Sequence, residues 1–352
     1  TPVLIENTPE QHRTSCVFER GNWLVKTDSV NPDVPKSLNP FPKDQPYNRL
    51  GFAAWLLNKE NPLTARSVVN RFWEQIFGLG IVETLEDFGT QGAAPSHQEL
   101  LDWLALRFMN ENEWSMKKLI KDLVMSATYR QDSRMTKELY ERDPSNRLLA
   151  RGPRVRLSAE QIRDQALAVS GLLSKKMYGK SVMPYQPKGV WNSVYSGEYW
   201  KESEGEDKYR RSVYTYMKRT SLYPSQMMFD GSTREVCVSR RIRTNTPLQA
   251  LVTLNDSSFV VAARNFATEI LKQGKNSREQ IKAGYKMMLV RDMPEKKLAV
   301  LNGLYENALE QYKKDGDATL KLTKGETSSS QLAAMTIVAS AMLNLDEVLT
   351  KE

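Results

Sequence analysis

The residues of this sequence best suited to bind a ligand lie between residues 175 and 243. The candidates are three aromatic residues and two adjacent pairs of arginines: Trp191, Tyr199, Trp200, Arg210, Arg211, Arg240 and Arg241. Aromatic rings pack against sugars and other planar groups, and the guanidinium fork of arginine suits carboxylate or sulfate. The segment therefore predicts a site for a planar or anionic ligand.

The same segment holds two carboxylates, Asp230 and Glu235. They would serve as a general acid and base if the fold placed them at the separation that glycoside hydrolases use. The structural interpretation is that Arg240 or Arg241 pairs with Asp230 or Glu235 and so holds the segment to the rest of the protein. The sequence favours this structural network and leaves ligand binding and catalysis open as alternatives.

Residues that bind metals are scarce. The chain has two histidines, His12 and His97, and two cysteines, Cys16 and Cys237. These numbers exclude cysteine zinc ribbons, His-Glu-x-x-His metalloproteases, covalent haem attachment and multi-cysteine iron–sulfur sites. We therefore expect no metal and no cofactor in this chain. The two cysteines can form a disulfide or remain free thiols, and their spacing does not decide which.

The chain has 352 residues, 40% of them hydrophobic and 26% charged, with a formal net charge of +8 and a pI of about 9.2. This is enough apolar material for one large core or two smaller ones. The basic residues are spread thinly, with no basic helix or RNA-binding motif, so nucleic acid is not an expected partner. The longest uncharged apolar stretch, residues 332–345, is too short to span a bilayer, and we expect no transmembrane segment.

The pattern of apolar residues predicts a mainly α, multi-helix domain with an N-terminal β-hairpin and an irregular insertion containing a little β structure. A hairpin turning at Gly21-Asn22 and a proline-rich linker fill residues 1–46. Helical spacing follows in two regions, 47–174 and 244–352, on either side of the insertion at 175–243. We interpret these segments as one composite domain, and the start without methionine as a sign of a longer precursor.

Local signals predict several boundaries. Capping boxes are expected at residues 96–99, 158–161 and 246–249, with Asp256 as a further N-cap and Gly78 as a C-cap. Helices are expected over 277–289 and 294–313, followed by a polar loop over 314–330 and a last helix to about residue 349. Inside the insertion, alternation over 212–217 predicts a strand.

Eight short strings occur in a characteristic order. They are NRLG (48–51), NPLTAR (61–66), VNR (69–71), EDFG (86–89), SATYRQ (126–131), NRLLAR (146–151), TNTPLQAL (244–251) and LNLDE (343–347). In these strings the chain resembles the C-terminal domain of unknown function of planctomycete cytochrome-c-associated proteins. The resemblance implies a long exported precursor, an extracytoplasmic location (periplasm, envelope or secreted) and other domains of the same precursor as partners. Any haem would belong to one of those domains.

We therefore expect an exported helical module that binds or docks, either to another domain of its precursor or to an anionic polysaccharide. The alternative is a polysaccharide-active enzyme that uses Asp230 or Glu235. The resemblance assigns no activity to particular residues. Its recurrent Asn, Arg and Pro residues also fit a structural role, because such arginines bridge helix ends and carboxylates inside large α domains.

Overall fold

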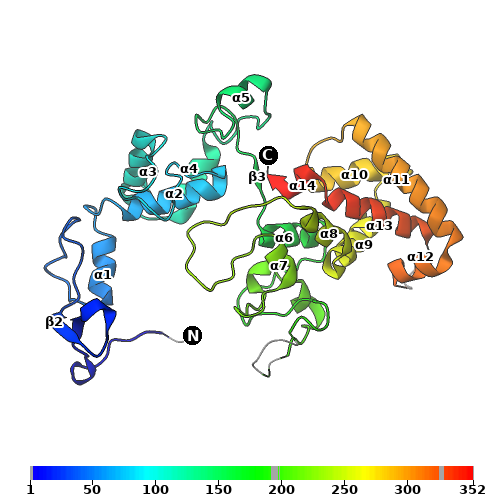
Figure 1. Cartoon of the computed structure of the whole chain (residues 1–352). Coiled ribbons are helices and arrows are strands. Elements are labelled where there is room, and N and C mark those ends of the chain that lie inside the picture. Colours follow the sequence, from blue (N-terminus) through cyan, green and yellow to red (C-terminus); the bar gives the residue numbers. More distant parts are fainter. Residues whose placement is uncertain (1–2, 192–196, 198, 325–328, 352) are drawn as a thin grey trace. The chain divides into compact units, whose positions relative to one another are not determined.

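The computed structural model describes residues 3–191, 197, 199–324 and 329–351. The chain forms two compact units. Unit 1 comprises Thr1–Gln131 and Met135–Arg151, and unit 2 comprises Asp132–Arg134 and Gly152–Glu352. The boundary between them falls inside the first of the two predicted helical regions, 47–174. Both units consist mainly of helices (Figure 1), which confirms the predicted fold class.

Unit 1 begins with a β-hairpin and continues as helices. Its elements, with η marking short 3-10 helices, are η1 (Pro9–Gln11), β1 (Ser15–Phe18), η2 (Glu19–Gly21), β2 (Lys26–Val30), α1 (Arg49–Leu56), α2 (Thr64–Phe77), α3 (Gln98–Asn110), α4 (Met116–Met125) and α5 (Lys137–Arg142). The apolar stripes of α2, α3 and α4 form the core, where Val69, Phe108 and Leu119 are fully buried. This packing follows from the helical spacing of these residues.

The hairpin differs from its prediction. β1 and β2 pair antiparallel, with Ser15 opposite Val30 and Phe18 opposite Lys26, and residues 19–25 connect them. The two-residue turn predicted at Gly21-Asn22 is wrong. Arg20 and Gly21 both adopt positive φ (48° and 79°), so η2 extends the connection before the chain reverses.

Two helix ends in unit 1 test the predicted caps. Gly78 ends α2 in the left-handed conformation (φ 85°), as predicted. The capping box at residues 96–99 is wrong, because His97 is the N-cap of α3 and makes no side-chain cap. The Ser96 hydroxyl donates instead to the carbonyl oxygen of Ile81 at 3.3 Å. This hydrogen bond joins the two ends of the loop between α2 and α3.

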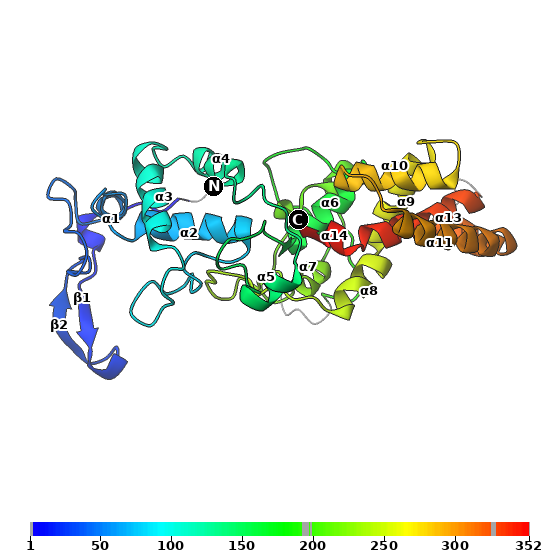
Figure 2. The ribbon, with the colours of Figure 1, turned by 90° about the horizontal axis from the view of Figure 1, so that it is seen from above.

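Unit 2 is a helical body with short strands at its ends. Its elements are β3 (Val155–Arg156), α6 (Ala159–Val169), η3 (Gly205–Tyr209), η4 (Ser212–Tyr214), α7 (Pro224–Met228), α8 (Pro247–Asn255), α9 (Ser257–Leu271), α10 (Ser277–Leu289), α11 (Glu295–Lys314), α12 (Gly316–Thr323), α13 (Ser330–Leu343), α14 (Asp346–Leu349) and β4 (Thr350–Lys351). β3 and β4 pair antiparallel. Helix α13 packs against α9 and α11 (Figure 2), burying Phe266, Met335 and Val338 completely.

Several boundaries of unit 2 agree with their predictions. The capping box at residues 158–161 is present, Asp256 caps α9, and α10 covers 277–289. At 246–249 the predicted box is wrong: Pro247 begins α8, but the Thr246 side chain makes no cap. The last predicted helix is also interrupted, because Leu345 is extended between α13 and α14.

The polar loop predicted over 314–330 is only partly correct, because α12 lies within it. Asp315 caps this helix by accepting a hydrogen bond from the N–H of Ala318. Thr319 and Thr323 are buried, and their hydroxyls donate to the carbonyls of Asp315 and Thr319. A helix whose buried face carries threonines lacks the apolar stripe that would reveal it.

The insertion is irregular, as predicted, and is built from η3, η4, α7 and isolated bridges. The strand predicted over 212–217 is wrong, since residues 212–214 form η4 and only Thr215 bridges to Val182. Residues 192–196 and 198 of this segment lie outside the described residues. Within the described stretches of the chain, every helix falls short of the length and apolarity needed to cross a bilayer.

Candidate functional site

Two cavities lined by described residues of unit 2 share some of their lining residues. The first, here the aromatic cavity, has a volume of about 570 Å³. Its described lining residues are Tyr185, Gln186, Pro187, Lys188, Gly189, Trp191, Gly197, Tyr199, Trp200 and Glu202. All three aromatic residues that the sequence singled out, Trp191, Tyr199 and Trp200, therefore line one cavity.

Hydrogen bonding and ring packing hold the two tryptophans in place. The indole N–H of Trp200 donates to the carbonyl oxygen of Pro184 at 2.8 Å, and its ring stacks on Tyr223 at 5.8 Å between centroids. Trp191 is buried and meets Trp200 edge to face at 5.2 Å. Tyr199, in contrast, is 85% exposed. The tryptophans thus form a fixed wall, and Tyr199 is the ring that can adapt to a ligand.

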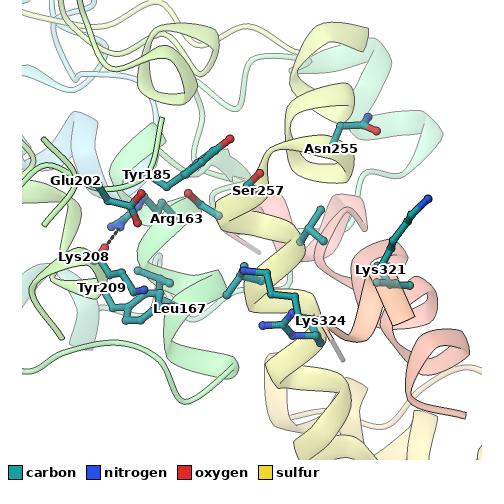
Figure 3. Close-up of a pocket in the computed structure, with 15 residues that line it drawn as sticks. Arg163, Leu167, Tyr185, Glu202, Lys208, Tyr209, Asn255, Ser257, Lys321 and Lys324 are labelled. Atoms are coloured by element: carbon teal, nitrogen blue, oxygen red, sulfur yellow. Dashed lines mark hydrogen bonds between the residues drawn. The ribbon is translucent and has the colours of Figure 1, made fainter. Parts of the chain in front are cut away.

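The second cavity, here the cationic cavity, has a volume of about 390 Å³ and also includes Tyr185 and Glu202 (Figure 3). Five of its described lining residues are cations: Arg163, Lys208, Arg264, Lys321 and Lys324. Glu202 is the one carboxylate among them, so the lining has a formal excess of four positive charges. The remaining lining side chains are neutral. Such a cavity attracts anions.

Four separate segments contribute these cations: α6, the insertion, α9, and α12 with its C-cap. Arg163 of α6 is 3% exposed and anchors the insertion. Its Nη1 donates to the carbonyl oxygen of Arg210 at 2.9 Å, and its Nη2 donates to that of Lys208 at 2.9 Å, the bond dashed in Figure 3. No described carboxylate lies within ion-pair distance of Arg163, although its charge acts on the buried Asp256 carboxylate.

Three other cations of the cavity likewise have no ion-pair partner among the described residues. Among the described residues, no carboxylate pairs with Arg264, Lys321 or Lys324. Arg264 is half-buried on α9, and Lys324 is the left-handed C-cap of α12. The Nζ of Lys208 lies 5.0 Å from the centroid of the Tyr209 ring. These charges are therefore free to meet a ligand.

Two buried polar groups hold parts of the cavity lining in place. The hydroxyl of Tyr223 donates to the carbonyl oxygen of Tyr185 at 2.7 Å, and burial raises the pKa of Tyr223. Behind the first turn of α9, the Asp256 carboxylate accepts from the N–H of Ser258 at 2.8 Å, and burial raises the pKa of Asp256. These contacts fix Tyr185 and the start of α9, both of which face the cationic cavity.

The four predicted arginines lie elsewhere, since none is among the described residues that line either cavity. Arg210 is 2% exposed; it donates to the carbonyl oxygens of Lys180 and Tyr178 and lies 3.8 Å from the Tyr214 ring centroid. It therefore organises the insertion from within. The Nε of Arg211 lies 3.6 Å from the Asp164 carboxylate.

The other two predicted arginines, Arg240 and Arg241, lie near the end of the insertion. The sequence predicted that Arg240 or Arg241 pairs with Asp230 or Glu235; Arg241 pairs instead with Glu160, at 2.8 Å. Arg240 is exposed and has a partner of its own.

Neither candidate carboxylate is among the described residues that line the aromatic cavity or the cationic cavity. Asp230 accepts from the N–H and the hydroxyl of Thr244 at 2.7 and 2.9 Å, and Glu235 is exposed.

Metal-binding residues do not converge in the described stretches of the chain. No group of three or more His, Cys, Asp or Glu side chains there could hold a metal ion. Cys16 is half-buried and Cys237 is exposed, and both are free thiols.

The sequence patterns did not reveal the cations of the cationic cavity. Arg264 lies among the apolar stripes of α9, and Lys321 and Lys324 fall in the stretch predicted to be a loop. The weak available signal was the position of Arg264, one turn after Val260 and Val261 on the same helix face. Nothing in the local sequence indicates that these segments converge.

Comparison with known proteins identifies the family. A family described as "Protein of unknown function (DUF1553)" matches residues 48–305, most of the chain. The match spans α6, the insertion and α9, which are three of the four segments that build the cationic cavity, together with seven of the eight recurrent strings. No curated protein and no solved structure matches the chain. The chain belongs to the DUF1553 family of proteins of unknown function.

Proposed function

We propose that this protein is a binding module for an anionic glycan and that unit 2 carries the site. One observation supports this most: the aromatic cavity and the cationic cavity share Tyr185 and Glu202. A surface for a sugar ring therefore adjoins a concentration of positive charge.

The chemistry of the two cavities is complementary. Sugar rings present C–H faces that pack on aromatic side chains, which lose little conformational entropy on binding. The exposed Tyr199 supplies such a face, backed by the half-buried Trp200 and the buried Trp191 that line the same cavity. The unpaired cations beside them suit the acidic group of the same glycan.

The alternative function, a polysaccharide-active enzyme using Asp230 or Glu235, has less support. The Asp230 carboxylate accepts hydrogen bonds from Thr244, and neither Asp230 nor Glu235 is among the described residues that line the two cavities. A glycosidase needs both carboxyl groups on opposite sides of a bound sugar.

The proposal also includes the setting of the protein. We expect an extracytoplasmic module whose other partners are domains of a longer, cytochrome-c-linked precursor. The resemblance of the eight strings is the support for this setting, and the haem would lie in one of those domains.

Affinity electrophoresis on acidic and neutral polysaccharides tests the binding function. We expect retention on acidic gels only, and at least a fivefold loss of retention in Tyr199→Ala. Tyr199 is exposed, so the variant should keep the melting temperature of the parent. Tyr140→Ala, which removes a 66% exposed tyrosine from unit 1, is the matched control. Equal migration of the parent on acidic and neutral gels would refute the proposal.

A further inference from the structure

We propose that the cationic cavity binds a phosphomonoester, so that the ligand is a phosphorylated sugar whose ring faces the aromatic cavity. This inference rests on the proposed function and specifies its acidic group.

The number of charges favours a dianion. Five cations and one carboxylate line the cationic cavity. A sugar carboxylate or a sulfate ester brings one negative charge, whereas a phosphomonoester carries nearly two at neutral pH, because its second pKa is about 6. The dianion neutralises more of the excess charge.

The arrangement of donors favours a tetrahedral group. A planar carboxylate is best bound by the two-pronged fork of an arginine. The fork of Arg163 is already engaged with the backbone carbonyls of Arg210 and Lys208. Arg264 is the other arginine among the described lining residues, and the remaining cations, Lys208, Lys321 and Lys324, are point charges. Cations on different segments match oxygens that point in different directions.

Glu202 orients the ligand. It lines both cavities, so it lies where the sugar would meet its phosphate. A carboxylate repels a phosphate group but accepts hydrogen bonds from sugar hydroxyls. It therefore directs the phosphate toward the cations and the hydroxyl-bearing ring toward Trp191 and Trp200.

Calorimetric titration of the full chain with glucose 6-phosphate, glucose 6-sulfate, glucuronate and inorganic phosphate tests the chemistry. We expect glucose 6-phosphate to bind at least tenfold more tightly than the sulfate ester or the uronate. Inorganic phosphate should bind more weakly than glucose 6-phosphate, since it lacks the ring. Tighter binding of the sulfate ester or the uronate, or equal binding of inorganic phosphate, would overturn the inference.

Two variants locate the site. Arg264→Gln and Lys324→Gln each remove an unpaired cation and should weaken glucose 6-phosphate binding at least fivefold. Lys296→Gln removes an exposed lysine of α11 outside the cavity lining and is the matched control for net charge. Unchanged affinity in both cavity variants, with parental melting temperatures, would contradict the assignment.

The pH dependence separates phosphate from sulfate. As the pH falls from 7.5 to 5.0, the phosphomonoester loses about nine-tenths of its dianion, so its affinity should fall about tenfold. Binding of the sulfate ester should stay level.

Unit 2 contains no histidine to mimic this response. The charged and titratable groups around the cavity are Arg163, Lys208, Arg264, Lys321, Lys324, Glu202, Tyr185, Tyr209 and, behind α9, Asp256 and Tyr223. A carboxylate near the cavity that took up a proton would strengthen anion binding, which is the opposite direction.

The two proposals fail in distinguishable ways. If acidic polysaccharides are retained through Tyr199 but sugar phosphates bind no more tightly than sulfates or uronates, the glycan-binding function stands and the phosphate assignment is wrong. If no acidic saccharide binds, both are wrong.

Discussion

Arg241 donates from Nη1 to both carboxylate oxygens of Glu160, at 3.0 and 2.8 Å. The two residues are 81 positions apart in the chain. Glu160 lies in the first turn of α6, and Arg241 lies near the end of the insertion. Their side chains are only 26% and 31% exposed, so this pair is more than a surface contact. It fastens the insertion to the helix that also contributes Arg163 to the cationic cavity.

Glu160→Gln should therefore destabilise unit 2, by about 1.5–3 kcal/mol at pH 7, the range for hydrogen bonds to charged groups. Burial acts to raise the pKa of Glu160, but the hydrogen bond and the charge of Arg241, together with hydrogen bonds from the backbone and from Ser158, outweigh burial and leave this pKa below its ordinary value. A carboxyl whose pKa is lower in the folded state stabilises the fold above its unfolded pKa, about 4.3, and this stabilisation is lost as the pH falls through the folded value. Urea denaturation should thus show the full difference at pH 7 and a smaller one at pH 3, below the unfolded pKa of about 4.3.

Glu310→Gln is the control for this prediction. Glu310 pairs with Lys314 on α11, and both side chains are about seven-tenths exposed. Exposed pairs contribute little, so this variant should lose less than about 0.5 kcal/mol at pH 7. A loss in Glu160→Gln that is the same at pH 7 and pH 3 would show that the ion pair is not its cause.

Asn70→Ala should destabilise unit 1 by about 2–4 kcal/mol. The Asn70 side chain is fully buried; its Nδ2 donates to the carbonyl oxygen of Val82 at 2.8 Å, and its Oδ1 accepts from the N–H of Val82 at 2.9 Å. Truncation leaves both backbone groups of Val82 without a partner, at about 1–3 kcal/mol each. The melting transition of unit 1 measures this.

Asn70→Asp refines that test. Aspartate keeps the acceptor for the N–H of Val82 but places a second oxygen against the Val82 carbonyl. It should be at least as destabilising as alanine at pH 7. A neutral result for either variant would mean that the Asn70 side chain does not hold the loop after α2.

Two glycines of unit 2 should respond to alanine in opposite directions. A Cβ at Gly171 or at Gly303 would meet nothing within 4 Å, so the two sites differ in backbone conformation alone. Gly171 has φ +72°, where an L-residue costs about 1–2 kcal/mol, and Gly171→Ala should destabilise by that amount. Gly303 lies inside α11, and Gly303→Ala should stabilise by up to about 1 kcal/mol. Thermal melts of both variants check the prediction, and a shift in the same direction in both would contradict it.

The purified protein should contain neither structural zinc nor haem. The reason is the scarcity of soft ligands: the chain has two histidines and two cysteines, and His12 and His97 belong to unit 1 whereas Cys237 belongs to unit 2. Elemental analysis should find no stoichiometric zinc, and a chelator should leave the melting temperature unchanged. Zinc that is lost together with the folded state would show the prediction to be wrong.

Features that depend on nearby residues were predictable from the sequence. The capping box at 158–161, the Asp256 cap, the end of α2 at Gly78 and the span of α10 each depend on residues within a few positions of one another. The mainly α fold followed from the same local periodicity. The prediction failed where buried threonines replaced apolar residues, as in α12, and where Ser96 bonded to Ile81 rather than to its own helix.

The candidate site shows the same division. The sequence alone determined that the insertion is irregular and supplies Trp191, Tyr199 and Trp200, because unusual composition is visible in the order of residues. Tertiary structure decided which groups pair with its arginines: Arg241 pairs with Glu160, and the buried Arg210 donates to backbone carbonyls. Likewise, Arg163, Arg264 and Lys324 form one cavity only because α6, α9 and the end of α12 converge. Periodicity and capping are short-range properties, whereas the sharing of a cavity depends on long-range packing that no single segment encodes.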